Sequence, residues 1–241
     1  MIFTRADLEA MPLQSLHKAR NWSKADVFGG ERDGVRFVIK DFRRAPVWFK
    51  PVARNFLKRE WTALRALDGV EHVPRALAHP DADSIVLELA AGEQMDKMAF
   101  GTVPHASIET LIELVRTLHA RGVTHGDLHQ QNVLVDVSGQ ICLIDWATAH
   151  VFHHPRGVRR WLFEEFSALD RRALAKIKVH HAPDLVTEED LDLIRNGASR
   201  AYRSVKKMRR IGEVLRGKKR YGALERKIES LNDKSLADKK R

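Results

Sequence analysis

The sequence predicts an α+β fold of two lobes, with a small β-rich lobe over residues 1–89 and a helical lobe over residues 90–198. Three observations support this prediction. Strand-like segments rich in β-branched and aromatic residues gather before residue 90. After that point, apolar residues recur at the three- and four-residue spacing of helices. The 241 residues, 44% of them hydrophobic, are enough for one sizeable core or for a domain of two lobes.

The first lobe is expected to contain one helix before its strands and one between them. The stretch near residues 5–20 reads as helical, and residues 56–67 place leucine and tryptophan at helical spacing. Glu60 therefore lies on a helix beside an apolar stripe. Asp33-Gly34 suits the turn of a hairpin. Strands are expected at three places, namely residues 25–28, 35–42 and 84–89.

The segment that links the second strand to the Glu60 helix is basic and aromatic. Its prolines at positions 46 and 51 predict a loop. Trp48 and Phe49 lie there between Arg44 and Lys50, and two interpretations of this aromatic pair stay open. The pair caps the core, or it inserts at a membrane interface.

Helices are also expected in the second lobe. Residues 108–118 carry apolar side chains at helical spacing, and residues 161–178 read as helical as well. Thr187 is followed by three acidic residues, which is the start of a capping box. A further helix is therefore expected to run from there through Ile194.

The most informative segment is HGDLHQQN at residues 125–132, followed by an apolar strand at residues 141–144 and then by Asp145. Phosphoryl transfer to a hydroxyl needs a carboxylate near the acceptor and two oxygen ligands for Mg²⁺. A tight loop presents Asp127 and Asn132 together, and a short turn can bring Asp145 back beside them. Because Mg²⁺ prefers carboxylate and amide oxygens, we expect Asn132 and Asp145 to hold it. Asp127 is expected to take the hydroxyl proton.

This segment resembles the protein-kinase-like superfamily, whose pattern is H-x-D-L-x-x-x-N followed by a hydrophobic strand and an aspartate. Five positions separate Asp127 from Asn132 and thirteen separate Asn132 from Asp145, as in the superfamily. The resemblance implies a two-lobed protein-kinase-like fold with ATP between the lobes. It also implies a catalytic Lys40 at the end of a strand similar to V-A-I-K, with Glu60 as its salt-bridge partner.

The resemblance further implies which residues contact ATP. The glycine-rich phosphate loop is absent, and residues 22–28 resemble the abbreviated loop of RIO-type atypical kinases. The end of the strand at residues 84–89 and the linker after it correspond to the hinge that meets adenine. The implied cofactor-binding residues are Ser23, Lys24, Val27, Lys40, Glu60, Glu88, Leu89 and Ala90.

Other features depart from typical protein kinases. Trp146 stands where the superfamily has the phenylalanine of D-F-G, and there is no A-P-E segment. Only a short link separates Asp145 from the helix expected at residues 161–178, so a broad peptide platform is not expected. His129, within the run His-Gly-Asp-Leu-His, resembles aminoglycoside and choline kinase-like proteins. This resemblance favours a non-peptide hydroxyl as acceptor.

The excess positive charge lies in the last part of the chain. Residues 199–241 contain 16 Lys and Arg against 5 Asp and Glu, a net charge of +11, whereas the preceding 198 residues contain 26 against 27, a net charge of −1. The first part of this tail has the pattern of a basic amphipathic helix. Such a helix can dock on the domain, lie on an anionic membrane surface, or contact nucleic acid, in that order of preference.

Three functions compete. The short core and basic flanks narrowly favour a kinase that phosphorylates a lipopolysaccharide-core sugar or a similar saccharide lipid, as the Kdo and heptose kinases do. The alternative is an atypical RIO-like protein serine/threonine kinase, and a second alternative is a non-catalytic nucleotide- or RNA-binding module. No apolar stretch approaches the roughly 18 residues that could span a bilayer. We therefore expect a cytoplasmic protein whose tail can bring it to the inner face of the membrane.

Overall fold

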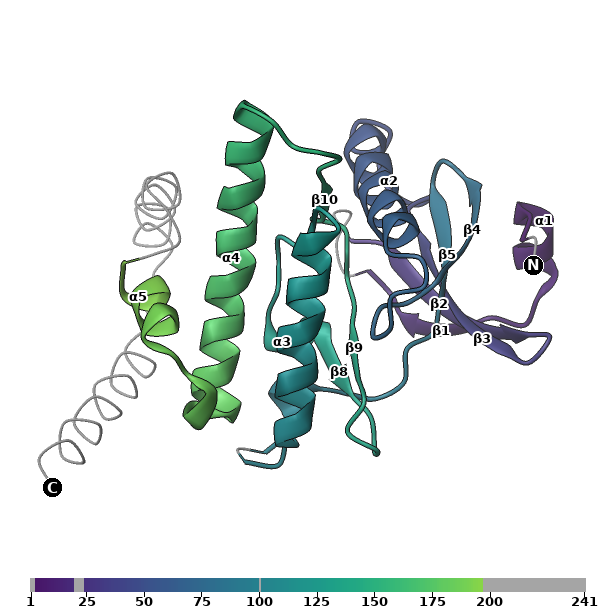
Figure 1. Ribbon diagram of the computed structural model, residues 1–241. Helices are drawn as coiled ribbons and strands as arrows, with labels where there is room; N and C mark the ends of the chain where they lie inside the picture. Colours follow the sequence, from purple (N-terminus) through teal and green to yellow (C-terminus); the bar gives the residue numbers. More distant parts are fainter. Residues whose placement is uncertain (1–2, 20–23, 100, 197–241) are drawn as a thin grey trace, which may run out of the picture.

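The computed structural model describes residues 3–19, 24–99 and 101–196. A main β-sheet lies in the first half of the chain, and the long helices α3 and α4 lie in the second half (Figure 1). The predicted α+β fold, with a β-rich N-terminal part and a helical C-terminal part, is confirmed. The tail at residues 199–241 lies outside the described residues, so its predictions stay predictions. Within the described ranges, no helix is both long enough and apolar enough to cross a membrane.

Five antiparallel strands form the main sheet, in the spatial order β1-β2-β3-β5-β4. The predicted strands at residues 25–28, 35–42 and 84–89 correspond to β2, β3 and β5. The predicted hairpin turn joins β2 to β3, and Asp33 and Gly34 have φ values of 52° and 74°. Both residues are left-handed, as the favoured two-residue hairpin turn requires. The strands are β1 (Gln14–His17), β2 (Asp26–Arg32), β3 (Val35–Asp41), β4 (Ala76–Asp81) and β5 (Ser84–Glu88).

The prediction of a helix near residues 5–20 is wrong beyond the first half of that stretch. α1 spans Arg5–Ala10 with Met11 as its C-cap, and the chain then pairs as β1 with β2. Thr4 and Asp7 form a capping box that fixes the start of α1. Its end follows from Pro12, because a proline favours extended backbone at the residue before it. Met11 accordingly has φ −86° and ψ 147°.

The two faces of β3 have different uses, because successive side chains of a strand point to opposite sides. Phe37 and Ile39 are buried in a cluster with Phe3 and Leu8, on the face of the sheet that α1 covers. Lys40 lies in the alternate register and lines a cavity on the other face. Strand register therefore decides that Lys40 is available to a ligand.

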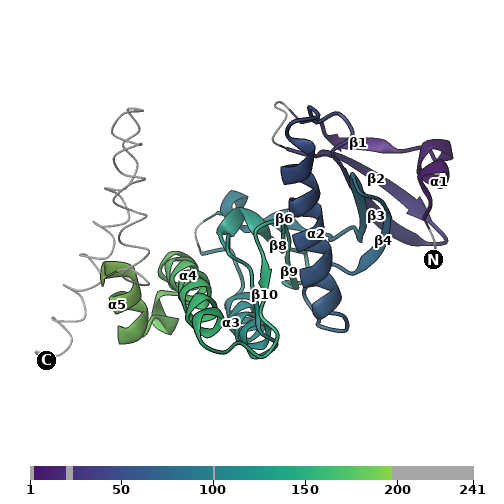
Figure 2. The same ribbon diagram turned by 90° about the horizontal axis from the view of Figure 1, so that it is seen from above.

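α2 (Lys50–Ala66) lies between the main sheet and the second half of the chain (Figure 2). It begins before the predicted residues 56–67 and has Pro51 in its first turn, a position where the missing N–H of proline costs nothing. Phe49 is 7% exposed and packs in the main core, whereas Trp48 is 65% exposed. The core-capping interpretation therefore holds for Phe49, and membrane contact by Trp48 stays a prediction.

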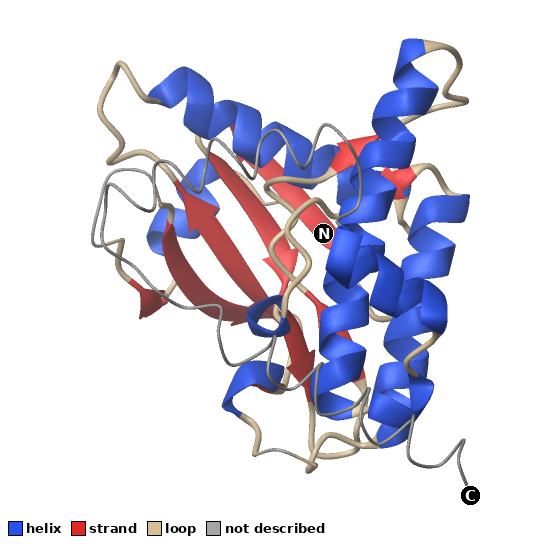
Figure 3. Ribbon diagram, turned by 90° about the vertical axis from the view of Figure 1, so that its left-hand side faces the viewer, coloured by secondary structure: helices blue, strands red, loops and turns tan. Residues whose placement is uncertain are grey.

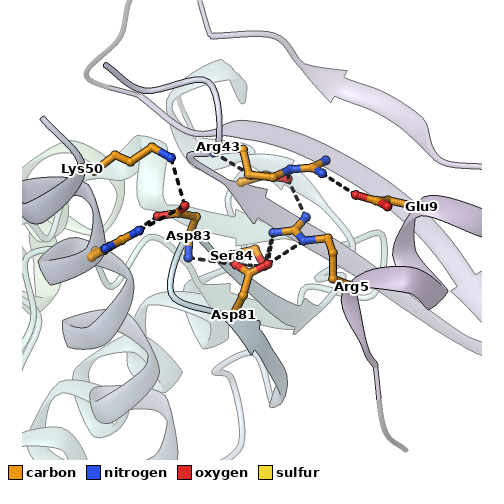
Figure 4. A network of polar contacts seen from close by, with 9 residues as sticks. Arg5, Glu9, Arg43, Lys50, Asp81, Asp83 and Ser84 are labelled. Carbon is orange, nitrogen blue, oxygen red and sulfur yellow. Dashed lines mark hydrogen bonds and ion pairs between the residues drawn. The ribbon is translucent and has the colours of Figure 1, made fainter. Parts of the chain in front are cut away.

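A polar network holds α1 and the first half of α2 to the main sheet (Figure 4). Arg5 of α1 donates hydrogen bonds to Asp41 of β3 (2.9 Å) and to Asp81 of β4 (2.6 Å). Asp83, in the turn that joins β4 to β5, accepts a hydrogen bond of 2.7 Å from Arg54 of α2. The start of α2 is thus anchored to the lobe that carries Lys40.

The second half contains the predicted helices, which lie to one side of the main sheet (Figure 3). The helices predicted at residues 108–118 and 161–178 and after Thr187 are all present. Thr187 and Asp190 cap the last of them by mutual hydrogen bonds of 2.8 and 3.2 Å. The helices are α3 (His105–Ala120), α4 (Val158–His181) and α5 (Glu188–Asn196), with the 3₁₀ turns Met95–Lys97, Gln130–Asn132 and Pro183–Leu185.

Two small sheets position the loops between these helices. One sheet has the order β6-β8-β9, and the other pairs β7 with β10 in antiparallel fashion. The predicted strand before Asp145 is β9. The strands are β6 (Glu93–Gln94), β7 (Val123–Thr124), β8 (Val133–Val135), β9 (Ile141–Leu143) and β10 (His150–Val151).

Candidate active site

The predicted ion pair between Lys40 and Glu60 is present. The Nζ atom of Lys40 lies 2.7 Å and 2.9 Å from the two carboxylate oxygens of Glu60, whose side chain is 1% exposed. Glu60 is buried because it shares the core-facing side of α2 with Leu57 and Leu64, three and four residues away. Burial lowers the pKa of Lys40, but the charge of Glu60, with that of Asp145, outweighs it. The pKa of Lys40 is raised, and its ammonium stays charged.

Asp145 completes this group from the end of β9. One of its carboxylate oxygens lies 3.2 Å from the Nζ atom of Lys40. The charge of Lys40 holds the pKa of Asp145 below its ordinary value, so the carboxylate is ionised at neutral pH. The backbone of Asp145 has φ 66°, a left-handed conformation that is unusual for a residue other than glycine. Such strained residues concentrate at functional sites.

The loop after β7 presents Asp127 and Asn132. The side-chain amide of Asn132 donates a hydrogen bond of 3.0 Å to the backbone carbonyl of Asp127. Because the nitrogen is used in this way, the amide oxygen is left to accept a cation. His129 lies 3.5 Å from the carboxylate of Asp127 and 3.2 Å from the amide nitrogen of Asn132. The carboxylate of Asp127 is 59% exposed and open to a substrate.

A cavity of about 610 Å³ joins most of the predicted residues. Asp127 does not line it, although Asn132 of the same loop does. Ser23 lies outside the described residues. The carboxylate of Glu88 accepts a hydrogen bond of 2.9 Å from Arg75, so its charge is already paired. The predicted residues that line the cavity are Lys24, Val27, Lys40, Glu60, Glu88, Leu89, Ala90, Asn132 and Asp145.

The oxygen donors of this cavity fit Mg²⁺. Asp145 supplies an ionised carboxylate and Asn132 an amide oxygen, and both line the same space. Mg²⁺ is commonly held by one or two such protein groups together with phosphates and water. In the part of the chain that the structure describes, no group of three or more His, Cys, Asp and Glu residues could hold a metal ion.

Sequence reasoning missed Asp170 of α4, which holds the loop at residues 125–132. We call this segment the catalytic loop, because it carries the predicted catalytic residues Asp127 and Asn132. This carboxylate is 1% exposed and accepts hydrogen bonds from the backbone amides of His125 (2.8 Å) and Gly126 (2.9 Å). Asp170 lies on the buried face of α4, four residues before Leu174 and seven before Ile177. The sequence signal that could have indicated a buried role for this residue is an acidic side chain within the apolar stripe of a helix.

His125 packs inside the protein beneath the loop of Asp127 and Asn132. Its ring is fully buried, and its Nε2 atom lies 3.0 Å from the backbone carbonyl of Ile144. Trp146 is also fully buried, and its ring contacts that of His125 at 4.8 Å between centroids. The indole N–H donates to the carbonyl of Leu143 at 2.9 Å. The residue after Asp145 is thus locked into the core.

Comparison with known proteins identifies the family. The family model of the RIO domain matches residues 33–164, which is more than half of the chain. The chain belongs to the RIO family. The matched stretch contains Lys40, Glu60, Asp127, Asn132 and Asp145.

The similar curated proteins include two RIO-type kinases. The RIO-type serine/threonine-protein kinase Rio1 of Haloferax volcanii is 30% identical over 129 residues, which cover 52% of this chain and 42% of that protein. The RIO-type serine/threonine-protein kinase Rio2 of Methanocaldococcus jannaschii is 28% identical over 109 residues, which cover 43% of this chain and 40% of that protein. The matched regions thus span less than half of the length of these relatives.

A solved structure supports the fold. The Rio2 kinase of Chaetomium thermophilum, in a complex with ADP, Mg²⁺ and phosphoaspartate, matches 97% of this chain and 74% of its own. The TM-score is 0.56 at 16% sequence identity. The RIO protein described here therefore has the predicted two-lobed protein-kinase-like fold. The comparisons support the resemblance to RIO-type kinases, and they give no support to the resemblance to lipopolysaccharide sugar kinases.

Proposed function

We propose that this RIO protein is an ATP- and Mg²⁺-dependent kinase that phosphorylates serine or threonine hydroxyls of a protein. The observation that carries the proposal is the convergence of Lys40, Glu60, Asn132 and Asp145 on one cavity. The RIO-type relatives are serine/threonine-protein kinases, which favours a protein acceptor over the saccharide lipid that the sequence alone favours. ADP and Mg²⁺ in the Rio2 complex support the choice of nucleotide and metal.

Each side chain has a role in the proposed reaction. Lys40 neutralises charge on the phosphates, and Glu60 keeps the ammonium in place. Asn132 and Asp145 would hold Mg²⁺, which supplies further neutralisation of the phosphate oxygens when bound. The acceptor oxygen forms a bond to the γ-phosphorus, the bond from that phosphorus to the bridging oxygen breaks, and ADP leaves. Asp127 accepts the proton of the hydroxyl.

Adenine is expected at the other end of the cavity. The amides of Glu88 and Leu89 already donate to the backbone carbonyls of Arg75 (2.9 Å) and Arg36 (3.0 Å). Ala90 follows them on the cavity wall. We therefore expect its backbone groups, and not the Glu88 carboxylate, to bond the adenine edge.

A transfer assay tests the proposal. The protein is incubated with γ-labelled ATP and Mg²⁺, once with a soluble protein extract and once with a saccharide-lipid fraction. We expect label on protein serine or threonine, and label confined to the lipid fraction would overturn the proposed acceptor. Asp127→Asn should abolish transfer while ATP affinity stays near that of the wild type. Asp68→Asn is a control, because Asp68 has a similarly exposed carboxylate outside the cavity.

A further inference from the structure

α2 contacts the segment after Asp145 at two adjacent residues. Glu60 accepts a hydrogen bond from the backbone amide of Trp146, at 3.4 Å. Arg59 donates to the backbone carbonyls of Thr148 (3.0 Å) and Ala149 (3.1 Å). α2 and β10 accordingly lie side by side (Figure 1). The helix that carries the partner of Lys40 therefore holds both ends of the segment at residues 146–149.

This segment also contacts the catalytic loop. The hydroxyl of Thr148 donates a hydrogen bond of 3.0 Å to the carbonyl of His125. Gly126 has φ 78°, and a Cβ atom there would lie 2.8 Å from the carbonyl oxygen of Thr148. The carbonyl that accepts from Arg59 thus packs directly on the residue before Asp127. A continuous set of contacts leads from α2 through Thr148 to the catalytic loop.

An arginine suits this position chemically. Its guanidinium offers several donors in one plane, so it can bond two neighbouring carbonyls at once. Arg59 also contacts both ring nitrogens of His150, Nε2 and Nδ1. Burial, together with the charge of Arg59, lowers the pKa of His150 to about 4, so this ring is neutral and can accept. The ring stacks on Phe166 of α4 at 4.1 Å, which fixes its orientation.

We propose that Arg59 is a positioning residue for phosphoryl transfer, which holds residues 146–150 so that Asp145 and the Asp127 loop keep their alignment with the Lys40–Glu60 pair. This inference rests on the proposed kinase function. It assigns to Arg59 a role separate from that of Glu60, because Arg59 contacts neither Lys40 nor Asp145 in any hydrogen bond or ion pair among the described residues.

The same helix provides a matched control. Arg54 lies five residues before Arg59 and donates a hydrogen bond of 2.7 Å to Asp83. Asp83 is labelled in Figure 4. Loss of Arg54 therefore removes an arginine and its hydrogen bonds from α2 but leaves the contacts to residues 146–150 in place. Arg59→Met, Arg59→Lys and Arg54→Met can then be compared in the full chain, with thermal unfolding used to confirm that each is folded.

Two measurements are needed. The first determines kcat and the KM for ATP separately, at saturating Mg²⁺. We expect Arg59→Met to lower kcat about tenfold to a hundredfold, with KM for ATP changed by less than about threefold, because small misplacement of reacting groups costs rate. Arg59→Lys should keep at least about threefold more kcat than Arg59→Met, since an ammonium can still bond one carbonyl. Arg54→Met should stay within about twofold of the wild type.

The second measurement is amide hydrogen exchange in the free protein. Arg59→Met should speed exchange of the amides at residues 146–151 about tenfold or more, and Arg54→Met should leave them unchanged. Equal kcat in Arg59→Met and Arg54→Met, or unchanged exchange in Arg59→Met, would overturn the inference about Arg59. If the wild type transfers no phosphate, the proposed function fails, and the exchange data still decide whether Arg59 holds the segment.

Discussion

Replacement of Asp170 by asparagine tests how the catalytic loop is held. One oxygen of the Asp170 carboxylate accepts from the amide of Gly126, and the other accepts from the amide of His125 and lies 3.3 Å from the ring of His119. Asparagine keeps the shape but replaces one oxygen by an NH₂ group, which cannot accept a hydrogen bond. One of the two buried backbone amides must therefore lose its partner.

The size of the effect follows from these contacts. A hydrogen bond to a charged group contributes about 1.5 to 3 kcal/mol, and a buried donor without a partner costs about 1 to 3 kcal/mol. These two estimates describe overlapping losses, so we expect the free energy of unfolding to fall by about 2 to 4 kcal/mol. For a protein of this size, Tm should fall by about 4 to 16 °C. Turnover should fall as well, because Gly126 immediately precedes Asp127.

Urea denaturation and the ATP transfer assay measure both effects. Asp184→Asn is the control, since Asp184 accepts a hydrogen bond of 2.8 Å from His105 but its side chain is 67% exposed. The control should lose less than about 1 kcal/mol, as exposed ion pairs contribute little. An Asp170→Asn variant with the stability of the control and full turnover would refute the claim that Asp170 holds the catalytic loop.

Three further substitutions test the core of the site. Lys40→Met leaves Glu60 buried without its cation, so denaturation at pH 7 should show that the free energy of unfolding falls by about 3 to 5 kcal/mol. The double variant, in which Glu60 is also replaced by methionine, should largely restore it. Trp146→Ala removes a fully buried ring, and the same measurement should show a loss of about 3 to 5 kcal/mol. The pKa of His150 is about 4 in the folded protein against an ordinary 6.5, so the unfolded chain binds the extra proton. Wild-type stability should therefore fall as pH drops from 6.5 towards 4, and His150→Phe should lose less over that range.

The local patterns predicted the elements that position the site. The alternation of β3, the helical stripe around Glu60 and the strand before Asp145 are all local signals, and each places its residue correctly. The spacing of Asp127, Asn132 and Asp145 then fixes their order along the chain. Local patterns could not predict which residues from distant parts of the sequence contact these elements.

The errors have the same physical origin. β1 is only four residues long and its side chains are exposed, so it has no apolar alternation and exists because β2 offers it a partner. Asp170 reads as one acidic residue of a helix until the catalytic loop supplies the amides that it accepts from. Arg59 likewise reads as a surface charge of an amphipathic helix. Its role depends on backbone carbonyls that lie 89 and 90 residues later in the chain.

The burial of Glu60 shows why the site is built for geometry more than for stability. Removing two charges from water costs several kcal/mol for each ion, and their attraction repays this cost only in good geometry. Burial raises the pKa of Glu60, and Lys40 opposes that shift. A well-packed apolar pair in place of Lys40 and Glu60 is expected to be as stable, and the double methionine variant tests this. What the apolar pair would lose is an ammonium held between a buried carboxylate and the half-exposed carboxylate of Asp145. Only that arrangement keeps a positive charge fixed at the wall of a cavity that also presents metal-binding oxygens.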